Sequence, residues 1–140
     1  MSDLIQRFAA YAQAFEEAYA DDNWSRLEPH FAHNAVYLPG DGTAAIGRDA
    51  VLATLRDSVN ALDRRFKHRK LELHSAPRVE NDLVTLRWRV SYSDEALQDL
   101  VISGTELATF YDGAIQRLED IFDDEAIDAL NRWVAQAKRP

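Results

Sequence analysis

Apolar residues near the start of the chain recur at intervals of three and four positions, which is the spacing of one helix face. This pattern predicts an amphipathic helix from Asp3 to Ala20. The same spacing continues through a short helical segment from Trp24 to Phe31, which Pro29 interrupts. It returns after Gly47 and predicts another helix that ends near Arg64.

Beyond Phe66 the apolar period changes from about 3.6 residues to two, which is typical of strands. A short strand is already predicted at Ala35–Leu38, before the turn at residues 39–42. Four longer strands are predicted around 71–73, at 84–92, at 100–111 and, after the Asp112-Gly113 hairpin turn, through Phe122. Asp123 or Asp124 is placed to cap a last helix.

This order of elements predicts an α+β fold in which helices lie on one side of an antiparallel sheet. With 140 residues, of which 46% are hydrophobic, the chain is expected to form one domain over residues 1–140. A net charge of −8 argues against nucleic acid and anionic membranes as partners. The chain has no cysteine, which excludes disulfides and thiolate catalysis. Its first residues lack the pattern of a signal peptide, so a cytoplasmic location is expected.

Three groups of residues carry a resemblance to a known family. They are Trp24-x-x-Leu27-x-x-x-Phe31-Ala32-x-x-Ala35-Val36-Tyr37, then Gly47-Arg48-Asp49-Ala50-Val51, then Asp112-Gly113-x-Ile115-x(6)-Phe122-Asp123. In their order and spacing the chain resembles the nuclear-transport-factor-2-like superfamily, in its SnoaL-like branch, over nearly its whole length. The resemblance implies a cone-shaped sheet around a pocket for a small apolar molecule, in a homodimer formed through the outer sheet face. That superfamily holds enzymes of several kinds and non-catalytic modules, so the fold alone does not assign the chemistry.

Asp120 and Tyr37 are the candidate catalytic residues, because limonene-epoxide hydrolases carry a pocket carboxylate and a water-orienting tyrosine on the corresponding strands. A carboxyl group in an apolar pocket has its pKa raised toward neutrality and can act as a general acid or base. The alternative is that Asp120 belongs to a solvated acidic stretch with its charged neighbours.

Other parts of these relatives' machinery are missing. Where the epoxide hydrolases have an asparagine two residues after the tyrosine, this chain has Pro39, and their Arg-x-Asp motif appears as Trp88-Arg89-Val90. The acid–base residues of ketosteroid isomerases align with Pro39, Phe15 and Thr105 or Leu107, none of which can perform that chemistry. Proton transfer centred on Asp120, as in SnoaL-like cyclases, is the catalytic hypothesis that survives.

The pocket wall is expected to contain aromatic and apolar side chains from several elements: Tyr11, Phe15, Tyr19, Trp24, Phe31, Trp88, Leu107 and Leu118. The alternation of residues along the third long strand leaves two faces to choose from. We place Thr105, Leu107 and Thr109 in the pocket and Glu106 on the opposite face, as an interface residue that could pair with Arg87 or Arg89.

No metal or cofactor is predicted, since the spacing of His30 and His33 in a loop does not favour a metal site. His68 and His74 lie among charged residues and are expected at the surface or at a subunit contact. Two functions therefore remain: a cofactor-free isomerase, cyclase or hydrolase, and a non-catalytic ligand-binding or dimerisation module. A subunit of a larger assembly would instead expose an apolar sheet face around Leu100, Ile102, Ala108 and Phe110.

Overall fold

The computed structural model describes residues 3–95 and 97–137. The chain begins with α1 (Asp3–Asp21) and the 3-10 helix η1 (Trp24–His30), followed by β1 (Phe31–Leu38), β2 (Ala45–Ile46), α2 (Arg48–Ala61) and the 3-10 helix η2 (Asp63–Arg65). The second half consists of β3 (His68–Leu73), β4 (Arg78–Glu80), β5 (Leu83–Asp94), β6 (Leu97–Tyr111), β7 (Ala114–Phe122) and the final helix α3 (Asp124–Ala137).

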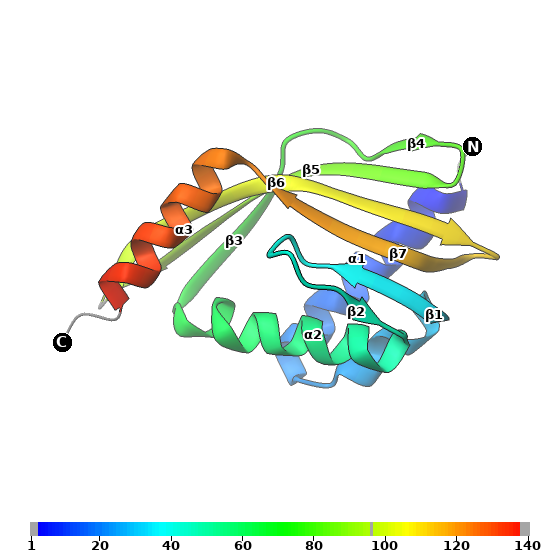
Figure 1. Cartoon of the computed structure of the whole chain (residues 1–140), viewed down its shortest axis with the longest axis horizontal. Coiled ribbons are helices and arrows are strands. Elements are labelled where there is room, and N and C mark those ends of the chain that lie inside the picture. The colour runs from blue at the N-terminus through cyan, green and yellow to red at the C-terminus, as the bar shows by residue number, and fades with distance from the viewer. Residues whose placement is uncertain (1–2, 96, 138–140) are drawn as a thin grey trace.

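The strands form one curved sheet with the order β2-β1-β7-β6-β5-β3, and β4 pairs with β5 beside β3. Strands β3, β5, β6 and β7 are antiparallel neighbours, whereas β1 runs parallel to β7. Figure 1 shows α1 and α2 together below the sheet and α3 at its other end. The α+β architecture predicted from the sequence is therefore confirmed.

All three long helices pack against the inner face of the sheet, in two separate clusters. The larger cluster joins α1, η1 and α2 to β1, β5, β6 and β7 through buried side chains such as Phe8, Leu27, Val51 and Leu118. The smaller cluster packs Trp133 of α3 against Phe66, Tyr92 and the neighbouring residues of β5 and β6. Burial of these apolar side chains is the main stabilising contribution to the fold.

Two local features differ from the sequence prediction. The prediction of a meander did not include β2, β4 or the parallel pairing of β1 with β7. Asp123 does precede α3, and its backbone oxygen accepts hydrogen bonds from the N–H groups of Ala126 and Ile127. Its carboxylate does not cap the helix, because it binds Arg87 and Ser103 instead.

The β6–β7 hairpin determines which side chains reach the interior. Asp112 and Gly113 have φ angles of 51° and 83°, which suit a two-residue hairpin turn. Phe110 pairs with Ile115, but Thr109 pairs with Arg117, so Gln116 is an extra residue in β7. This β-bulge shifts the register of the rest of the hairpin by one residue.

The alternation of buried residues along β6 corrects our assignment of the two sheet faces. The four residues proposed above for an apolar outer face, Leu100, Ile102, Ala108 and Phe110, are all buried inside. The outer face instead carries Val101 and Ile121, which are 40% and 47% exposed, among charged and polar side chains. Dimerisation through this face stays a prediction. No helix in the described part of the chain has the length and apolar character needed to cross a membrane.

Candidate functional site

A cavity of about 490 Å³ lies between α1, α2 and the inner face of the sheet. Its wall is mostly apolar and aromatic, with Phe8 and Phe15 from α1, Trp88 from β5 and Phe122 from β7 among the contributors. This volume is in the range of pockets that enclose small organic molecules. Polar groups are concentrated at two places in the wall.

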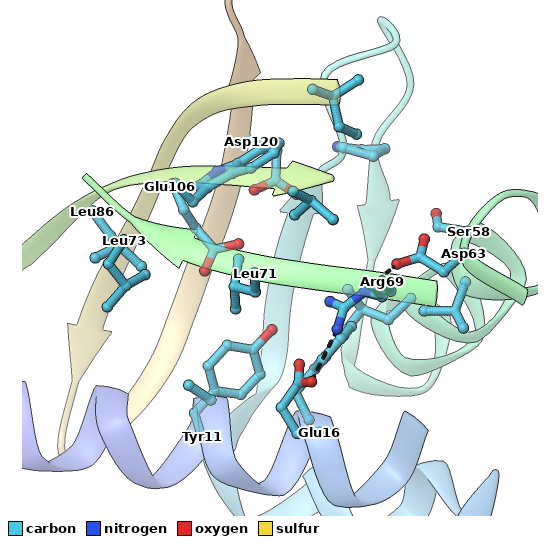
Figure 2. A pocket seen from close by; sticks show the side chains of 18 of the residues that line it. Tyr11, Glu16, Ser58, Asp63, Arg69, Leu71, Leu73, Leu86, Glu106 and Asp120 are labelled. Carbon is cyan, nitrogen blue, oxygen red and sulfur yellow. Dashed lines mark hydrogen bonds and ion pairs between the residues drawn. The ribbon is translucent and has the colours of Figure 1, made fainter. Parts of the chain in front are cut away.

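The first polar group is a pair of carboxyl side chains on adjacent strands. Glu106 of β6 and Asp120 of β7 are direct partners in the antiparallel register, so both side chains project from the same face. The two carboxyl groups share a hydrogen bond, and both line the cavity. Figure 2 shows them side by side on the sheet, facing α1 across the cavity.

Tyr37 holds the second carboxyl group of this pair in position. It lies on β1, which runs beside β7, and its side chain is 4% exposed. The Tyr37 hydroxyl donates a hydrogen bond of 2.6 Å to Oδ2 of Asp120. Because a tyrosine hydroxyl that donates in this way stabilises a negatively charged acceptor, it favours the ionised form of Asp120.

The surroundings of the two carboxyl groups shift their pKa values by different amounts. Burial is the main cause that raises the pKa of Glu106 well above its usual range, and the neighbouring Asp120 raises it further. Burial also raises the pKa of Asp120, but hydrogen bonds from Glu106 and Tyr37 oppose that rise. The arrangement therefore keeps the proton on Glu106 and the negative charge on Asp120.

Tyr11 faces this pair from α1. Its hydroxyl points into the cavity on the side where Glu106 and Asp120 lie (Figure 2). Burial and the nearby carboxyl groups raise the pKa of Tyr11 well above its usual value, so the phenol stays protonated. Phe31 packs edge-on against the Tyr11 ring at 5.4 Å and helps to fix its position.

The second polar group is centred on Arg69 of β3, at another part of the cavity wall. Nη1 of Arg69 binds Oε1 of Glu16 at 2.9 Å, and Nε binds Oδ2 of Asp63 at 2.8 Å. The Tyr92 hydroxyl donates a 3.0 Å hydrogen bond to the same Asp63 oxygen. These contacts connect α1, η2, β3 and β5, so the cluster joins the helices to the edge of the sheet.

The structure brings Asp120 and Tyr37 together, and it places Tyr11, Phe15 and Trp88 in the cavity wall. Trp88 can lie along this wall because its partner on β6 is Gly104, where a Cβ atom would come within 3.0 Å of the indole ring. Five residues proposed for the pocket lie elsewhere: Tyr19, Trp24, Phe31, Leu107 and Leu118.

Each of these five differences has a structural reason. Tyr19 packs under the guanidinium groups of Arg64 and Arg69, outside the cavity. Trp24, Phe31 and Leu118 belong to the core behind the cavity wall. Leu107 lies on the outer face because residues of β6 alternate and its neighbour Glu106 points inward.

Glu106 is the site residue that the sequence reasoning missed. We expected it at an interface with Arg87 or Arg89, but Arg87 lies on the outer face and binds Thr105 and Asp123. Charged residues are usually exposed, and this tendency favoured the wrong face of β6. The available signal was that Gly104 and Ala108, which share the face of Glu106 on this strand, are small. Small side chains leave room for other groups on an inward-facing strand surface.

The histidines stay outside this site. His33, His68 and His74 are exposed, and His30 lies at the end of η1 against the Tyr11 ring. Among the residues that the structure describes, no group of three His, Asp or Glu side chains could hold a metal ion.

The sequence of residues 12–118 matches the SnoaL-like domain family. The chain belongs to this family. No curated protein sequence matches it at a significant level. The family match agrees with the inner-face cavity and with the resemblance found in the sequence.

Solved structures of SnoaL-like and related proteins share this fold. A protein of Jannaschia sp. CCS1 assigned as a SnoaL-like polyketide cyclase has a TM-score of 0.72 at 13% identity, covering 100% of this chain and 98% of its own. A polyketide cyclase assignment also applies to a Xanthomonas campestris pv. campestris protein with a TM-score of 0.61 at 23% identity, covering 95% and 98%. An LEH-like epoxide hydrolase of M. tuberculosis has a TM-score of 0.64 at 14% identity, covering 94% and 95%.

Proposed function

We propose that this SnoaL-like protein is a cofactor-free enzyme that binds a small, largely apolar carbonyl compound and moves a proton between its carbon and oxygen atoms. The observation that carries this proposal is the placement of Glu106 and Asp120 as direct partners on adjacent strands in the wall of one apolar cavity. Two carboxyl groups in one cavity wall with different protonation states provide a base and an acid in one place.

In the proposed reaction, the Asp120 carboxylate removes a proton from the carbon next to the carbonyl group. The electron pair of that C–H bond moves into the carbon–carbon bond, and the carbonyl oxygen gains electron density. Once Asp120 is protonated, the proton of Glu106 is released from its hydrogen bond to Asp120 and passes to that oxygen, while the hydroxyl of Tyr11 donates a hydrogen bond from α1. Return of the two protons to other positions, or attack of the enol on a second carbonyl carbon, would complete an isomerase or cyclase reaction.

Tyr37 is a positioning residue in this scheme because its hydrogen bond fixes the carboxylate that acts as the base. The polyketide cyclase assignments of two structural relatives support carbonyl chemistry. Epoxide hydrolysis of the kind expected for an LEH-like relative has less support. Among the described residues of the cavity wall, the basic side chain is Arg69, and it belongs to the other polar cluster.

A non-catalytic binding module is the alternative that the sequence left open. That alternative requires Asp120 in solvent or in a salt bridge, without a partner for proton transfer. Instead, Asp120 lines the cavity and has hydrogen-bonding partners in Tyr37 and Glu106. This arrangement favours the enzyme over the binding module.

The proposal can be tested first without a substrate, by carbon NMR titration of the side-chain carboxyl groups. Asp120→Asn and Glu106→Gln assign the two resonances. We expect Glu106 to titrate well above the ordinary carboxyl range and its midpoint to fall when Asp120→Asn removes the neighbouring charge. Two independent titrations in the usual range would contradict the paired acid–base arrangement.

A second experiment measures the chemistry directly. A panel of apolar ketones such as 2-tetralone is incubated in deuterated buffer, and deuterium uptake next to the carbonyl group is followed by mass spectrometry. Asp120→Asn should lower the enzyme-dependent rate by about 100-fold or more. Glu119→Gln is the matched control, because Glu119 contacts Arg117 rather than the cavity wall. Equal rates in wild type and Asp120→Asn would exclude Asp120 as the base.

A further inference from the structure

The charges around the cavity are unbalanced. Its wall contains four acidic side chains, Glu16, Asp63, Glu106 and Asp120, and among the described residues of the wall Arg69 is the one basic side chain. Arg69 is already bound to two of the acids, at 2.9 Å and 2.8 Å. Its positive charge is therefore compensated within the protein before any ligand enters.

The entrance to the cavity is largely apolar. Residues that line the cavity and are also exposed mark its opening: four are apolar, Ala9 and Ala12 of α1 and Leu71 and Leu73 of β3, and two are polar, Ser58 and Glu16, whose carboxylate binds Arg69. Leu71 and Leu73 are 45% and 54% exposed although both side chains are aliphatic. A ligand that enters here must lose its water against hydrocarbon surface.

The carboxyl pair lies on the sheet across from α1 (Figure 2). A ligand that reaches the pair meets the Tyr11 hydroxyl, which is a hydrogen-bond donor, and a negative charge at Asp120. A neutral carbonyl oxygen can accept from Tyr11. An added carboxylate would stand beside the charge of Asp120 in a poorly solvated space, where repulsion between like charges is strong.

We propose that the cavity selects its substrate by charge: it accepts uncharged, largely apolar carbonyl compounds and rejects carboxylates of the same size and shape. This inference rests on the proposed function, because it names the substrate class of the same cavity. It adds that the enzyme acts on ketones, esters or lactones rather than on free acids.

Binding of matched aromatic probes tests the charge selection without any need for turnover. Each pair consists of a methyl ketone and the corresponding carboxylate, as in acetophenone and benzoate or 2-acetylnaphthalene and 2-naphthoate, with one to three rings. Dissociation constants are measured at pH 7 by calorimetry. We expect at least one ketone to bind, and each ketone that binds to do so at least about tenfold more tightly than its carboxylate, a difference of about 1.4 kcal/mol.

Two variants identify the source of the selectivity. The double variant Glu106→Gln, Asp120→Asn keeps the size of both side chains and removes the negative charge, so carboxylate binding should approach ketone binding. Glu119→Gln, on the outer face, should keep the wild-type ratio. Arg69→Met tests the opposite possibility, because loss of carboxylate binding in this variant would show that Arg69 serves as an anion site.

The outcomes separate this inference from the proposed function. Carboxylates that bind as tightly as the ketones, or the absence of binding by every ketone, would overturn the charge selection. If carboxylates bound as tightly as ketones but Asp120→Asn still abolished deuterium uptake, the proton-transfer function would be supported without the charge selection. If the ketones bound selectively but none exchanged deuterium, the charge selection would stand and the enzyme proposal would fail.

Discussion

The two polar regions of the cavity wall contain the same kind of group in opposite surroundings. Around Arg69, two carboxylates share one guanidinium group, and the Tyr92 hydroxyl completes the hydrogen bonding of Asp63. Around Asp120, two carboxyl groups face each other, and their partners are the hydroxyl of Tyr37 and each other. The first cluster contains a cation that balances one of its two negative charges, whereas the second contains no cation.

This difference separates structural stability from chemical reactivity. A partly buried cluster in which one cation binds carboxylates from different elements fixes the relative positions of those elements. A carboxyl pair without a cation costs folding free energy, because burial disfavours its charged form. The same burial raises the pKa of the pair toward neutral pH, where an acid or base is useful for catalysis. We therefore expect substitutions around Arg69 to change stability and substitutions around Asp120 to change activity.

The largest effect on stability is expected from Arg69→Met. This change keeps much of the aliphatic stem but leaves Asp63 without its cation, at side-chain exposures of 13% and 14% for the two residues. Loss of one partner from such a pair should lower the free energy of unfolding by about 3 kcal/mol at pH 7. Chemical denaturation measures this loss.

The pH dependence and a control sharpen this first prediction. Burial already raises the pKa of Asp63 despite the opposing effect of Arg69, so Asp63 without Arg69 should take up a proton more readily. The difference between wild type and variant should therefore shrink as the pH falls. Arg26→Met, which removes an exposed pair with Asp21, should change the stability far less, because solvent screens exposed ion pairs. Equal losses in both variants would contradict the structural role of the Arg69 cluster.

An intermediate effect of opposite sign is expected from Glu106→Gln. The raised pKa means that the folded protein keeps a proton that the unfolded chain releases above about the ordinary value of 4.5. Wild-type stability therefore falls as the pH rises from that value toward the raised pKa. Glutamine removes the titration while it can still donate a hydrogen bond to Asp120. At pH 7 the variant should be more stable by about 1 kcal/mol.

Thermal denaturation from pH 4 to pH 9 measures this second prediction. The curves of wild type and Glu106→Gln should converge at the acidic end and separate as the pH rises. Glu119→Gln should run parallel to wild type over the same range. A Glu106→Gln variant that is less stable than wild type at pH 7 would show that the carboxyl pair is a stabilising feature.

The smallest effect is expected from Asp123→Asn, three residues after Asp120 but on the outer side of the sheet. Asp123 binds both Nη atoms of Arg87 at 2.8 Å and accepts from Ser103, and these bonds lower its pKa to about 2. A lowered pKa contributes stability above the ordinary value of 3.8, and this contribution disappears as the pH falls through about 2.

Urea denaturation at several pH values tests this last prediction. The variant should lose about 1 kcal/mol or less at pH 7, because the pair is partly exposed. The difference from wild type should vanish near pH 2. Deuterium exchange and probe binding in the cavity should stay unchanged. A large loss of activity would instead mean that this outer contact positions Asp120 across the strand.

The elements themselves could be predicted from the sequence to a large extent. The helical spacing before Asp21 and the alternation after Phe66 predicted α1 and the long strands, since both periods follow from local backbone geometry. Asp112-Gly113 predicted the β6–β7 turn because these residues adopt positive φ angles readily. The parallel neighbours β1 and β7 escaped prediction because their pairing joins distant parts of the chain.

The candidate site could be predicted only in part from the sequence. Tyr37 and Asp120 were chosen through the family resemblance, and the structure places them in direct contact. Glu106 was assigned to the wrong face. A regular hairpin after the Asp112-Gly113 turn would place Thr105 opposite Asp120, and the extra residue Gln116 shifts Glu106 into that position.

The sequence by itself therefore determined the order of the long helices and long strands, the hairpin turn and the SnoaL-like family. Tertiary structure alone decided that Glu106 and Asp120 share one cavity and that Arg69 is compensated by Glu16 and Asp63. The physical reason is that secondary structure depends on neighbours in the chain, whereas the partner of a buried charge depends on strand register and helix packing. A shift of one residue in a strand is enough to exchange its two faces.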